Sequence, residues 1–248
     1  MGNTPAIRRF SKYQKNQVVF YGDIFGFKQC MDDIDRNKNY ERNDKDGIFV
    51  DLDIIYNAEI YKIDERIAES KVNFIWLSDS FAFASDVERW HTLKRKLLNF
   101  ISLLWSCDFI FSGALAFGDL HNGKNIMGAT FSKAVSLQEV CHTPEIVIDK
   151  SFYNQGLLSE KEIYVNEDSK ICFDYIFSML EDMNESNNCA SLECLYSLCS
   201  VGITNCESKV QSKYICMIVM VLRAIKKIHI LSDCLKEMEC KFQGLLNA

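Results

Sequence analysis

Two aspartates stand where the sequence changes from apolar to polar, and their side chains could hold a metal ion. Asp23 comes shortly after the β-rich run 17–21, and Asp79 lies between two apolar runs, 72–77 and 81–84. Carboxylates at neighbouring strand ends offer the hard oxygen ligands that Mg²⁺ and Mn²⁺ prefer. A metal pair held there could bridge a triphosphate and activate a hydroxyl group. The alternative is that both are ordinary surface aspartates at loop ends, and spacing alone favours that alternative.

The residues beside these aspartates shift the balance towards the metal hypothesis. Gly26 follows Asp23 closely, and consecutive backbone N–H groups leaving a strand can form a concave site for anions. Ser78, Asp79 and Ser80 interrupt two strongly apolar runs, which is an unusual place for a solvated loop. We therefore expect a β-hairpin whose tip presents Asp79 near Asp23.

The hydrophobic pattern predicts the elements that position this pair. Strands are expected at 17–21, 72–77, 81–84, 109–117 and 146–148, and helices at 48–67, 93–105 and 129–140. The resulting order, β-α-β-β-α-β-α-β, is typical of an α+β fold of the ferredoxin-like (palm) type, an antiparallel sheet with flanking helices. In such a sheet the strands that carry Asp23 and Asp79 are neighbours.

The C-terminal part of the chain carries apolar residues mainly at helical spacing. Helices are expected over 171–183, 192–199 and 213–235. We expect an N-terminal arm over 1–16, a catalytic domain over 17–150 and a mostly helical C-terminal extension over 151–248.

Composition and charge exclude several classes of protein. The chain has 248 residues, of which 48% are hydrophobic and 25% charged, as in ordinary globular proteins and unlike disordered chains. The formal net charge of −6 argues against direct binding to nucleic acid or to an anionic membrane. The longest apolar run, 214–222, is far shorter than the roughly 20 residues of a membrane span.

The eleven cysteines suggest reduced thiols rather than a metal or disulfide framework. Their number is odd, and two cysteines never stand three positions apart, as they do in the CxxC motif of many zinc sites. The start of the sequence has no apolar signal-peptide core. We therefore expect mostly buried, reduced thiols and a cytoplasmic location.

Four short motifs occur in a characteristic order along the chain. They are Asp23-Ile24-Phe25-Gly26-Phe27, Ser78-Asp79-Ser80, Gly113-Ala114-Leu115-Ala116-Phe117-Gly118 and Gly128-Ala129-x4-Ala134. Together they resemble the catalytic domain of class III nucleotidyl cyclases, and most closely the bacterial Pycsar cyclases, anti-phage enzymes that make cyclic UMP or cyclic CMP. The resemblance covers about residues 17–150, and more weakly the helix expected from Lys213.

The resemblance implies cyclisation of a nucleoside triphosphate with two divalent ions, Mn²⁺ or Mg²⁺. Asp23, Asp79 and the main-chain carbonyl of Ile24 would hold the metals. The ribose 3′-hydroxyl would attack the α-phosphorus in line, and pyrophosphate would leave.

The resemblance also implies how the substrate and a second subunit take part. The backbone amides of Phe25, Gly26 and Phe27 would cradle the β- and γ-phosphates. The active site would lie at a homodimer interface, with metals held by one subunit and other contacts supplied by its partner.

Departures from the purine cyclases point to a pyrimidine substrate. The lysine of their hairpin motif is missing, because Ile75, Trp76 and Leu77 stand there. Their purine-reading aspartate is Asn125 here, and an amide can meet the edge of uracil or cytosine. We expect UTP before CTP as the substrate. Asn125 could instead be an ordinary residue of the turn that begins at Asn122.

The expected cations at the α-phosphate are sparse. The asparagine and arginine of purine cyclases fall on Ser132 and about Ser136, and Ser112 replaces an arginine found in many Pycsar enzymes. Lys133 and Lys124 remain as candidates, although an ordinary solvated helix lysine is the favoured alternative for Lys133.

Three hypotheses follow for the function. The first is a cytoplasmic pyrimidine cyclase of bacterial anti-phage defence, with UTP preferred and CTP second. The second is a non-catalytic module of the same palm fold that binds a nucleotide or a protein, which the missing arginines favour. The third is a structural scaffold in which the two aspartates are incidental.

Overall fold

The structure is a computed structural model, and it describes most of the chain. The described residues are 14–26, 72–77, 79–122, 125–182, 185–206, 208–229 and 231–247. Most of the expected N-terminal arm and the helix expected over 48–67 lie outside these ranges.

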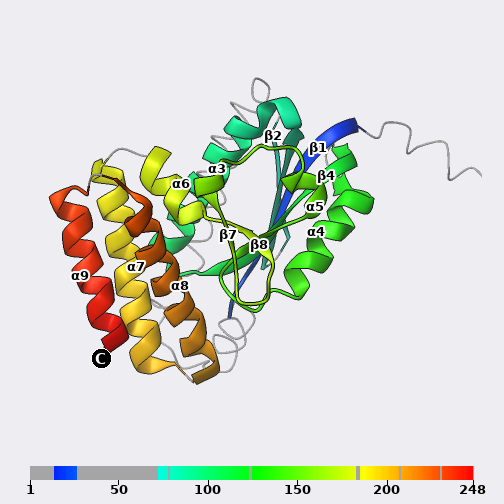
Figure 1. The fold of residues 1–248 in the computed structure, drawn as a ribbon. Helices are drawn as coiled ribbons and strands as arrows, with labels where there is room; N and C mark the ends of the chain where they lie inside the picture. The colour runs from blue at the N-terminus through cyan, green and yellow to red at the C-terminus, as the bar shows by residue number, and fades with distance from the viewer. Residues whose placement is uncertain are drawn as a thin grey trace, which may run out of the picture.

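Eight strands form a mixed sheet at the centre of the described chain (Figure 1). They are β1 (Gln14–Ile24), β2 (Val72–Leu77), β3 (Ser80–Asp86), β4 (Phe111–Asn122), β5 (Ile126–Met127), β6 (Ile146–Ile148), β7 (Ile163–Val165) and β8 (Ile171–Phe173). The first four lie in the order β2-β3-β1-β4, and each neighbouring pair is antiparallel. This is the strand order of a ferredoxin-like β-α-β-β-α-β unit, so the expected fold class is confirmed.

Seven α-helices surround the sheet in the described residues, together with two short 3₁₀ helices, η2 (Val87–Arg89) and η3 (Glu160–Glu162). They are α3 (Trp90–Ser106), α4 (Ala129–Glu139), α5 (Lys150–Tyr153), α6 (Tyr175–Asp182), α7 (Glu185–Asn205), α8 (Ser208–Lys227) and α9 (Asp233–Asn247). Figure 1 shows α7, α8 and α9 side by side as a C-terminal group, with α4 and α5 on the other side of the molecule. The helices predicted around 93–105 and 129–140 are confirmed as α3 and α4.

The two faces of the sheet bury side chains of different size. On the α3 face, large aromatic residues such as Phe20, Phe81 and Phe100 belong to the main core, which continues into α6, α7 and α8. On the α4 face the core is smaller and is built largely from small residues such as Ala82, Ala116 and Ala134. This alternation places every second residue of β1 and β3 on the α4 face.

The C-terminal half differs from the expectation in two places. Residues 171–173 form β8 rather than the start of a helix, and β8 pairs with both β6 and β7, so the sheet continues beyond residue 150. The single helix expected over 213–235 is two helices, α8 and α9. The Ser232 hydroxyl accepts a hydrogen bond from the Leu235 amide (3.3 Å) and so caps the start of α9.

The expectation that all cysteines are reduced is wrong at one pair. A disulfide joins Cys189 of α7 to Cys234 of α9. The cysteines at the other described positions are free. These two cysteines are 45 positions apart, and only the packing of α7 on α9 brings them together. The sequence around either residue therefore does not indicate the bond.

None of the helices within the described ranges has the length and apolar character of a transmembrane span.

A cross-strand pair of glycines makes room for the aromatic core behind the candidate site. Gly22 of β1 lies opposite Gly113 of β4. A Cβ atom on Gly113 would lie 2.6 Å from the Phe20 ring and 3.0 Å from the Tyr21 carbonyl oxygen. Because Phe20 is fully buried, its ring has no open space into which to move. The first glycine of the Gly-x4-Gly motif is thus explained by packing.

We predict that Gly113→Ala lowers the free energy of unfolding by about 1–3 kcal/mol, the usual cost of overpacking a core. Chemical denaturation monitored by circular dichroism measures this change. Gly244→Ala on α9 is the matched control, since no atom lies within 4 Å of its added Cβ and alanine favours a helix. A Gly113→Ala protein as stable as the wild type would contradict the packing argument.

Candidate active site

The end of β1 carries polar side chains on the α4 face of the sheet. Tyr21 and Asp23 alternate with Phe20 and Ile24, which point into the aromatic core. The register pairs Asp23 with Ser80 of β3 on one side and with Ser112 of β4 on the other.

Helix α4 covers this face and holds two of the neighbouring groups. Its Phe131 packs edge-on against Tyr21, with ring centroids 5.7 Å apart. Its Gln138 side chain donates a hydrogen bond to the buried Ser112 hydroxyl (2.9 Å). The position where Pycsar enzymes often have an arginine is therefore occupied by a serine already bonded inside the chain.

Asp79 reaches the same place from the turn between β2 and β3. The Ile24 amide donates a hydrogen bond to the Asp79 carbonyl oxygen (2.8 Å), which ties the turn to the end of β1. The Ser80 hydroxyl oxygen lies 3.0 Å from Asp23 Oδ1 and 3.4 Å from Asp79 Oδ1. Both carboxylates thus lie beside one hydroxyl, that of Ser80, for which no role was expected from the sequence.

The Ser80 hydroxyl is the centre of a short hydrogen-bonded chain. It accepts a hydrogen bond from the Tyr21 hydroxyl (2.9 Å). Because a serine hydroxyl has one proton, it can donate to one of the two carboxylates at a time. The other carboxylate then lies beside a like charge without a hydrogen bond from Ser80.

The electrostatics of the pair favour a cation. The pKa of Asp23 lies above its usual value. Burial raises this pKa most, and the negative charge of Asp79 raises it further. The Ser80 hydrogen bond and the positive charge of Lys213 act in the opposite direction. The pKa of Tyr21 is also raised, first by burial and in part by the charges of Asp23 and Asp79. A divalent ion between the carboxylates would relieve this repulsion.

The donor set fits Mg²⁺ or Mn²⁺ bound together with a phosphate. Within the described ranges, no group of three or more His, Cys, Asp or Glu side chains could hold a metal ion. Mg²⁺ is usually bound through one or two carboxylates, water and substrate phosphates rather than by a full cage of side chains. Asp23 and Asp79 supply that number of carboxylates, and the Ile24 carbonyl is the expected further ligand.

One of the amides expected to bind phosphate has another partner. The Phe25 N–H donates a hydrogen bond to the Ile110 carbonyl oxygen (2.9 Å), which argues against its part in a phosphate cradle. Gly26 is exposed and has a φ of +75°, a left-handed conformation that suits glycine. Phe27 lies outside the described residues, as do Ser78 and Lys124.

The structure places Lys133 away from the two aspartates. Its ammonium lies 2.7 Å from Asp149 Oδ1, at the end of β6. Burial alone would raise the pKa of Asp149, but the bonds from Lys133 and Ser151 lower it below its usual value. Lys133 is half exposed, so it could reach a bound ligand only by leaving this partner.

Asn125 also lies far from Asp23 within one chain. It is exposed and immediately precedes β5, which pairs with the last residues of β4. Asp23 pairs with Ser112 near the opposite end of β4. At about 3.3 Å per residue, the two ends of this part of β4 are roughly 30 Å apart. The structure therefore brings together Asp23, Asp79 and Ile24, and leaves Lys133 and Asn125 outside that cluster.

Three contributing residues were not assigned a site role from the sequence. Tyr21 and Ser80 could have been found, because period-two alternation places Tyr21 on the face of Asp23, and Ser80 directly follows Asp79. Lys213 of α8, whose charge acts on Asp23, has no local signal, since it is nearly 200 positions away in the sequence.

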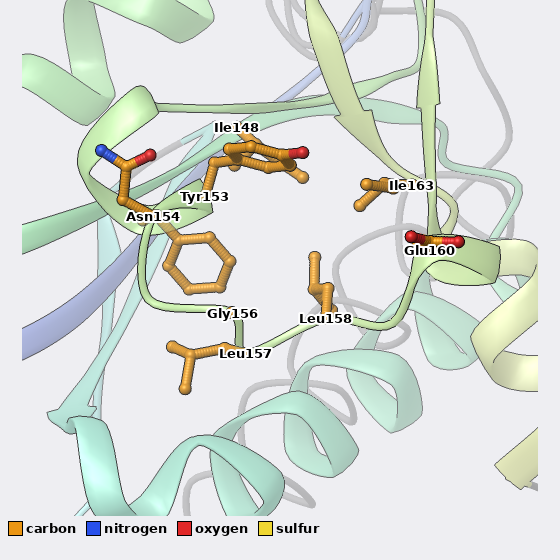
Figure 2. Close-up of a pocket in the computed structure, with 9 residues that line it drawn as sticks. Ile148, Tyr153, Asn154, Gly156, Leu157, Leu158, Glu160 and Ile163 are labelled. Atoms are coloured by element: carbon orange, nitrogen blue, oxygen red, sulfur yellow. The ribbon is translucent and has the colours of Figure 1, made fainter.

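A separate cavity lies between the end of β6, helix α5 and the start of β7 (Figure 2). It measures about 230 Å³, and its lining is mostly apolar, with Ile148, Leu157, Leu158 and Ile163 among the labelled side chains. Tyr153, Asn154 and Glu160 add polar atoms at its wall. It does not include Asp23 or Asp79, so it is distinct from the candidate active site.

Comparisons with known proteins give weak fold similarities. No protein-family model and no curated protein match this sequence. The monomeric guanylyl cyclase domain of the RhoGC fusion protein from the fungus Blastocladiella emersonii is 14% identical and has a TM-score of 0.42; the match covers 65% of this chain and 95% of that one. The guanylyl cyclase Cya2 is 9% identical, with a TM-score of 0.42 and coverage of 65% and 92%. The adenylyl cyclase CyaB from P. aeruginosa is 14% identical, with a TM-score of 0.38 and coverage of 65% and 95%.

We predict that Asp23→Asn is more stable than the wild type at neutral pH. The raised pKa means that the folded state binds the Asp23 proton more tightly than the unfolded state does. The wild type therefore loses stability as pH rises from about 4 through the carboxyl titration, and the uncharged amide avoids that loss. The advantage of Asp23→Asn in melting temperature should be small near pH 4 and larger at pH 7.

Thermal denaturation of both proteins across that pH range, without added metal, measures this difference. Asp119→Asn, at an exposed position of β4, controls for the loss of one negative charge. A lower melting temperature of Asp23→Asn than of the wild type at pH 7 would show that the pair is already stabilised without a cation.

Proposed function

We propose that this chain is a nucleotidyl cyclase that converts a pyrimidine nucleoside triphosphate, UTP before CTP, to the 3′,5′-cyclic monophosphate and pyrophosphate. The observation that carries the proposal is the convergence of Asp23 and Asp79 on the Ser80 hydroxyl at the end of β1. The order of the first four strands supports it, because this sheet makes the hairpin tip and the end of β1 neighbours.

Asp23, Asp79 and the Ile24 carbonyl are the residues proposed to hold Mn²⁺ or Mg²⁺. Ions bound there would lower the pKa of the attacking hydroxyl and would compensate the negative charge of the leaving pyrophosphate. The role of the chain is to pre-position the ligands. The Ser80 hydroxyl can donate a hydrogen bond to Asp23 and accepts one from the Tyr21 hydroxyl. Phe131 of α4 packs against the Tyr21 ring. This ordered chain reduces the reorganisation needed when substrate binds.

The choice of base and the assembly state are part of the same proposal. Because Asn125 lies roughly 30 Å from Asp23 along the sheet, it can read the base only from a second copy of the chain. A homodimer in which the partner's Asn125 faces Asp23 and Asp79 meets this requirement, and Lys133 would act across the same interface. The pyrimidine preference and the anti-phage role rest on the motif resemblance and on the residues that replace purine contacts. The proposed cytoplasmic location rests on the predominance of free thiols among the described cysteines.

A non-catalytic nucleotide-binding module is the second candidate, and two contacts favour it. Lys133 is paired with Asp149, and the Phe25 amide with Ile110, so two groups expected to act on phosphate have partners within the chain. Such a module would bind Mn²⁺ and nucleotide without turnover.

We predict that the purified protein with Mn²⁺ forms a cyclic product from UTP, or less readily from CTP, and not from ATP or GTP. Asp23→Ala and Asp79→Ala should each lower the rate by at least about 100-fold, or roughly 2.7 kcal/mol in activation free energy, because each removes a metal ligand. Mass spectrometry of reactions with each of the four ribonucleotides measures the product.

Asp119→Ala is the control for these variants, because Asp119 is an exposed aspartate on β4 outside the carboxylate pair. Residual activity above a hundredth of the wild type in both metal-ligand variants would mean that other acids hold the metal. Stabilisation by Mn²⁺ and nucleotide without any product would support the binding module instead.

We predict that Asn125 acts in the active site of the partner subunit. Asn125→Ala alone should lower pyrimidine turnover and change the UTP-to-CTP ratio, because a buried base edge would lose its polar partner. Mixing inactive Asp79→Ala with Asn125→Ala should restore activity, since one site of each mixed dimer contains both native residues. An unchanged UTP-to-CTP ratio in Asn125→Ala would show that this side chain does not read the base, and absence of restoration would contradict the shared site.

A further inference from the structure

The second turn of α8 places a lysine beside the candidate active site. The Lys213 ammonium lies 3.6 Å from the centroid of the Phe25 ring, and Phe25 is separated from Asp23 by only Ile24. Helix α8 is firmly anchored, because Met217, Ile218 and Val221 are fully buried in the main core. The position of Lys213 is therefore set by the packing of the C-terminal helices on the sheet.

The charge of Lys213 acts on the carboxylate pair. Lys213 lowers the pKa of Asp23, against the opposing effects of burial and of Asp79. Lys213 is thus a cation that the fold brings to the turn that follows β1.

A triphosphate bound at this site would need such a cation. The negative charge of a triphosphate together with Asp23 and Asp79 exceeds the positive charge of two divalent ions. The Phe25 amide, expected to bind phosphate, donates to Ile110 instead. An ammonium above the Phe25 ring offers up to three N–H donors at the same turn, and the ring face holds a cation there by electrostatic attraction.

We infer that Lys213 is a substrate-binding residue that contacts the polyphosphate of the nucleotide. The inference rests on the proposed function, in that it takes phosphate to be bound next to Asp23 and Asp79. It assigns to the C-terminal helical extension a direct part in the active site, within the same chain that holds the metals.

Lys213→Met tests this role, because methionine keeps a flexible apolar stem against Phe25 and removes the charge. Binding of inorganic tripolyphosphate in the presence of Mn²⁺, measured by isothermal titration calorimetry, should weaken at least about tenfold, which is 1.4 kcal/mol. Binding of Mn²⁺ alone should stay the same or become tighter, because a positive charge near the carboxylates is gone. A merely structural role of Lys213 would weaken both.

Two further variants complete the experiment. Lys213→Arg keeps the charge and should retain tripolyphosphate binding within a few-fold. Lys226→Gln removes an exposed lysine from the last turn of the same helix and should bind as the wild type does. If Lys213→Met does not fold, Lys213→Gln replaces it, with the melting temperature of each variant as the check.

The outcomes separate this inference from the proposed function. Tripolyphosphate binding that depends on Lys213, without turnover of any ribonucleotide, would support the inference and refute the cyclase. Turnover together with wild-type tripolyphosphate affinity in Lys213→Met would support the cyclase and overturn the inference. A wild-type protein that does not bind tripolyphosphate with Mn²⁺ would overturn the inference directly.

Discussion

The pairing of β1 with β3 is the constraint on which the candidate site depends. It sets Asp23 directly opposite Ser80, and the turn before Ser80 then brings in Asp79. Two like charges are held together at partly buried positions, with one shared hydroxyl between them. Without a cation, such an arrangement lowers the free energy of unfolding, and packing elsewhere in the fold must offset this loss. The closely packed aromatic residues on the other face of β1 and β3 are where that stability resides.

Elements of the fold that show a local apolar pattern could be predicted from the sequence, and the others could not. Strands β1 to β4 and helices α3 and α4 were predictable because alternating or helical apolar patterns report burial locally. The β7–β8 hairpin was missed because the apolar residues of β8 continue almost directly into those of α6, so that 171–183 shows a single helical pattern. Without β8 as a partner, the three residues of β7 show no period of their own. The break between α8 and α9 was missed because the apolar pattern continues across it, whereas the Ser232 cap is a single-residue signal.

The candidate site shows the same division. Asp23 and Asp79 were predictable, since each lies at the end of a strongly apolar run. Three contacts were not predictable. They are the hydrogen bond from the Phe25 amide to the Ile110 carbonyl, the ion pair of Lys133 with Asp149, and the position of the Lys213 ammonium over the Phe25 ring. Each joins residues from different elements of the fold, and each changes which groups remain for the proposed phosphate binding. The residues proposed to hold the metals are therefore encoded locally, whereas the groups proposed to meet phosphate depend on how separate elements pack.

The facing glycines Gly22 and Gly113 also restrict how the sheet can be assembled. Because side chains alternate along a strand, a shift of β1 by one residue against β4 would turn Asp23 towards the aromatic core and Phe20 towards α4. The space left by the two glycines accepts the Phe20 ring in one alignment only, since a shifted strand would place a side chain there. The two residues that lack side chains thus help to fix the register in which β1 pairs with β4.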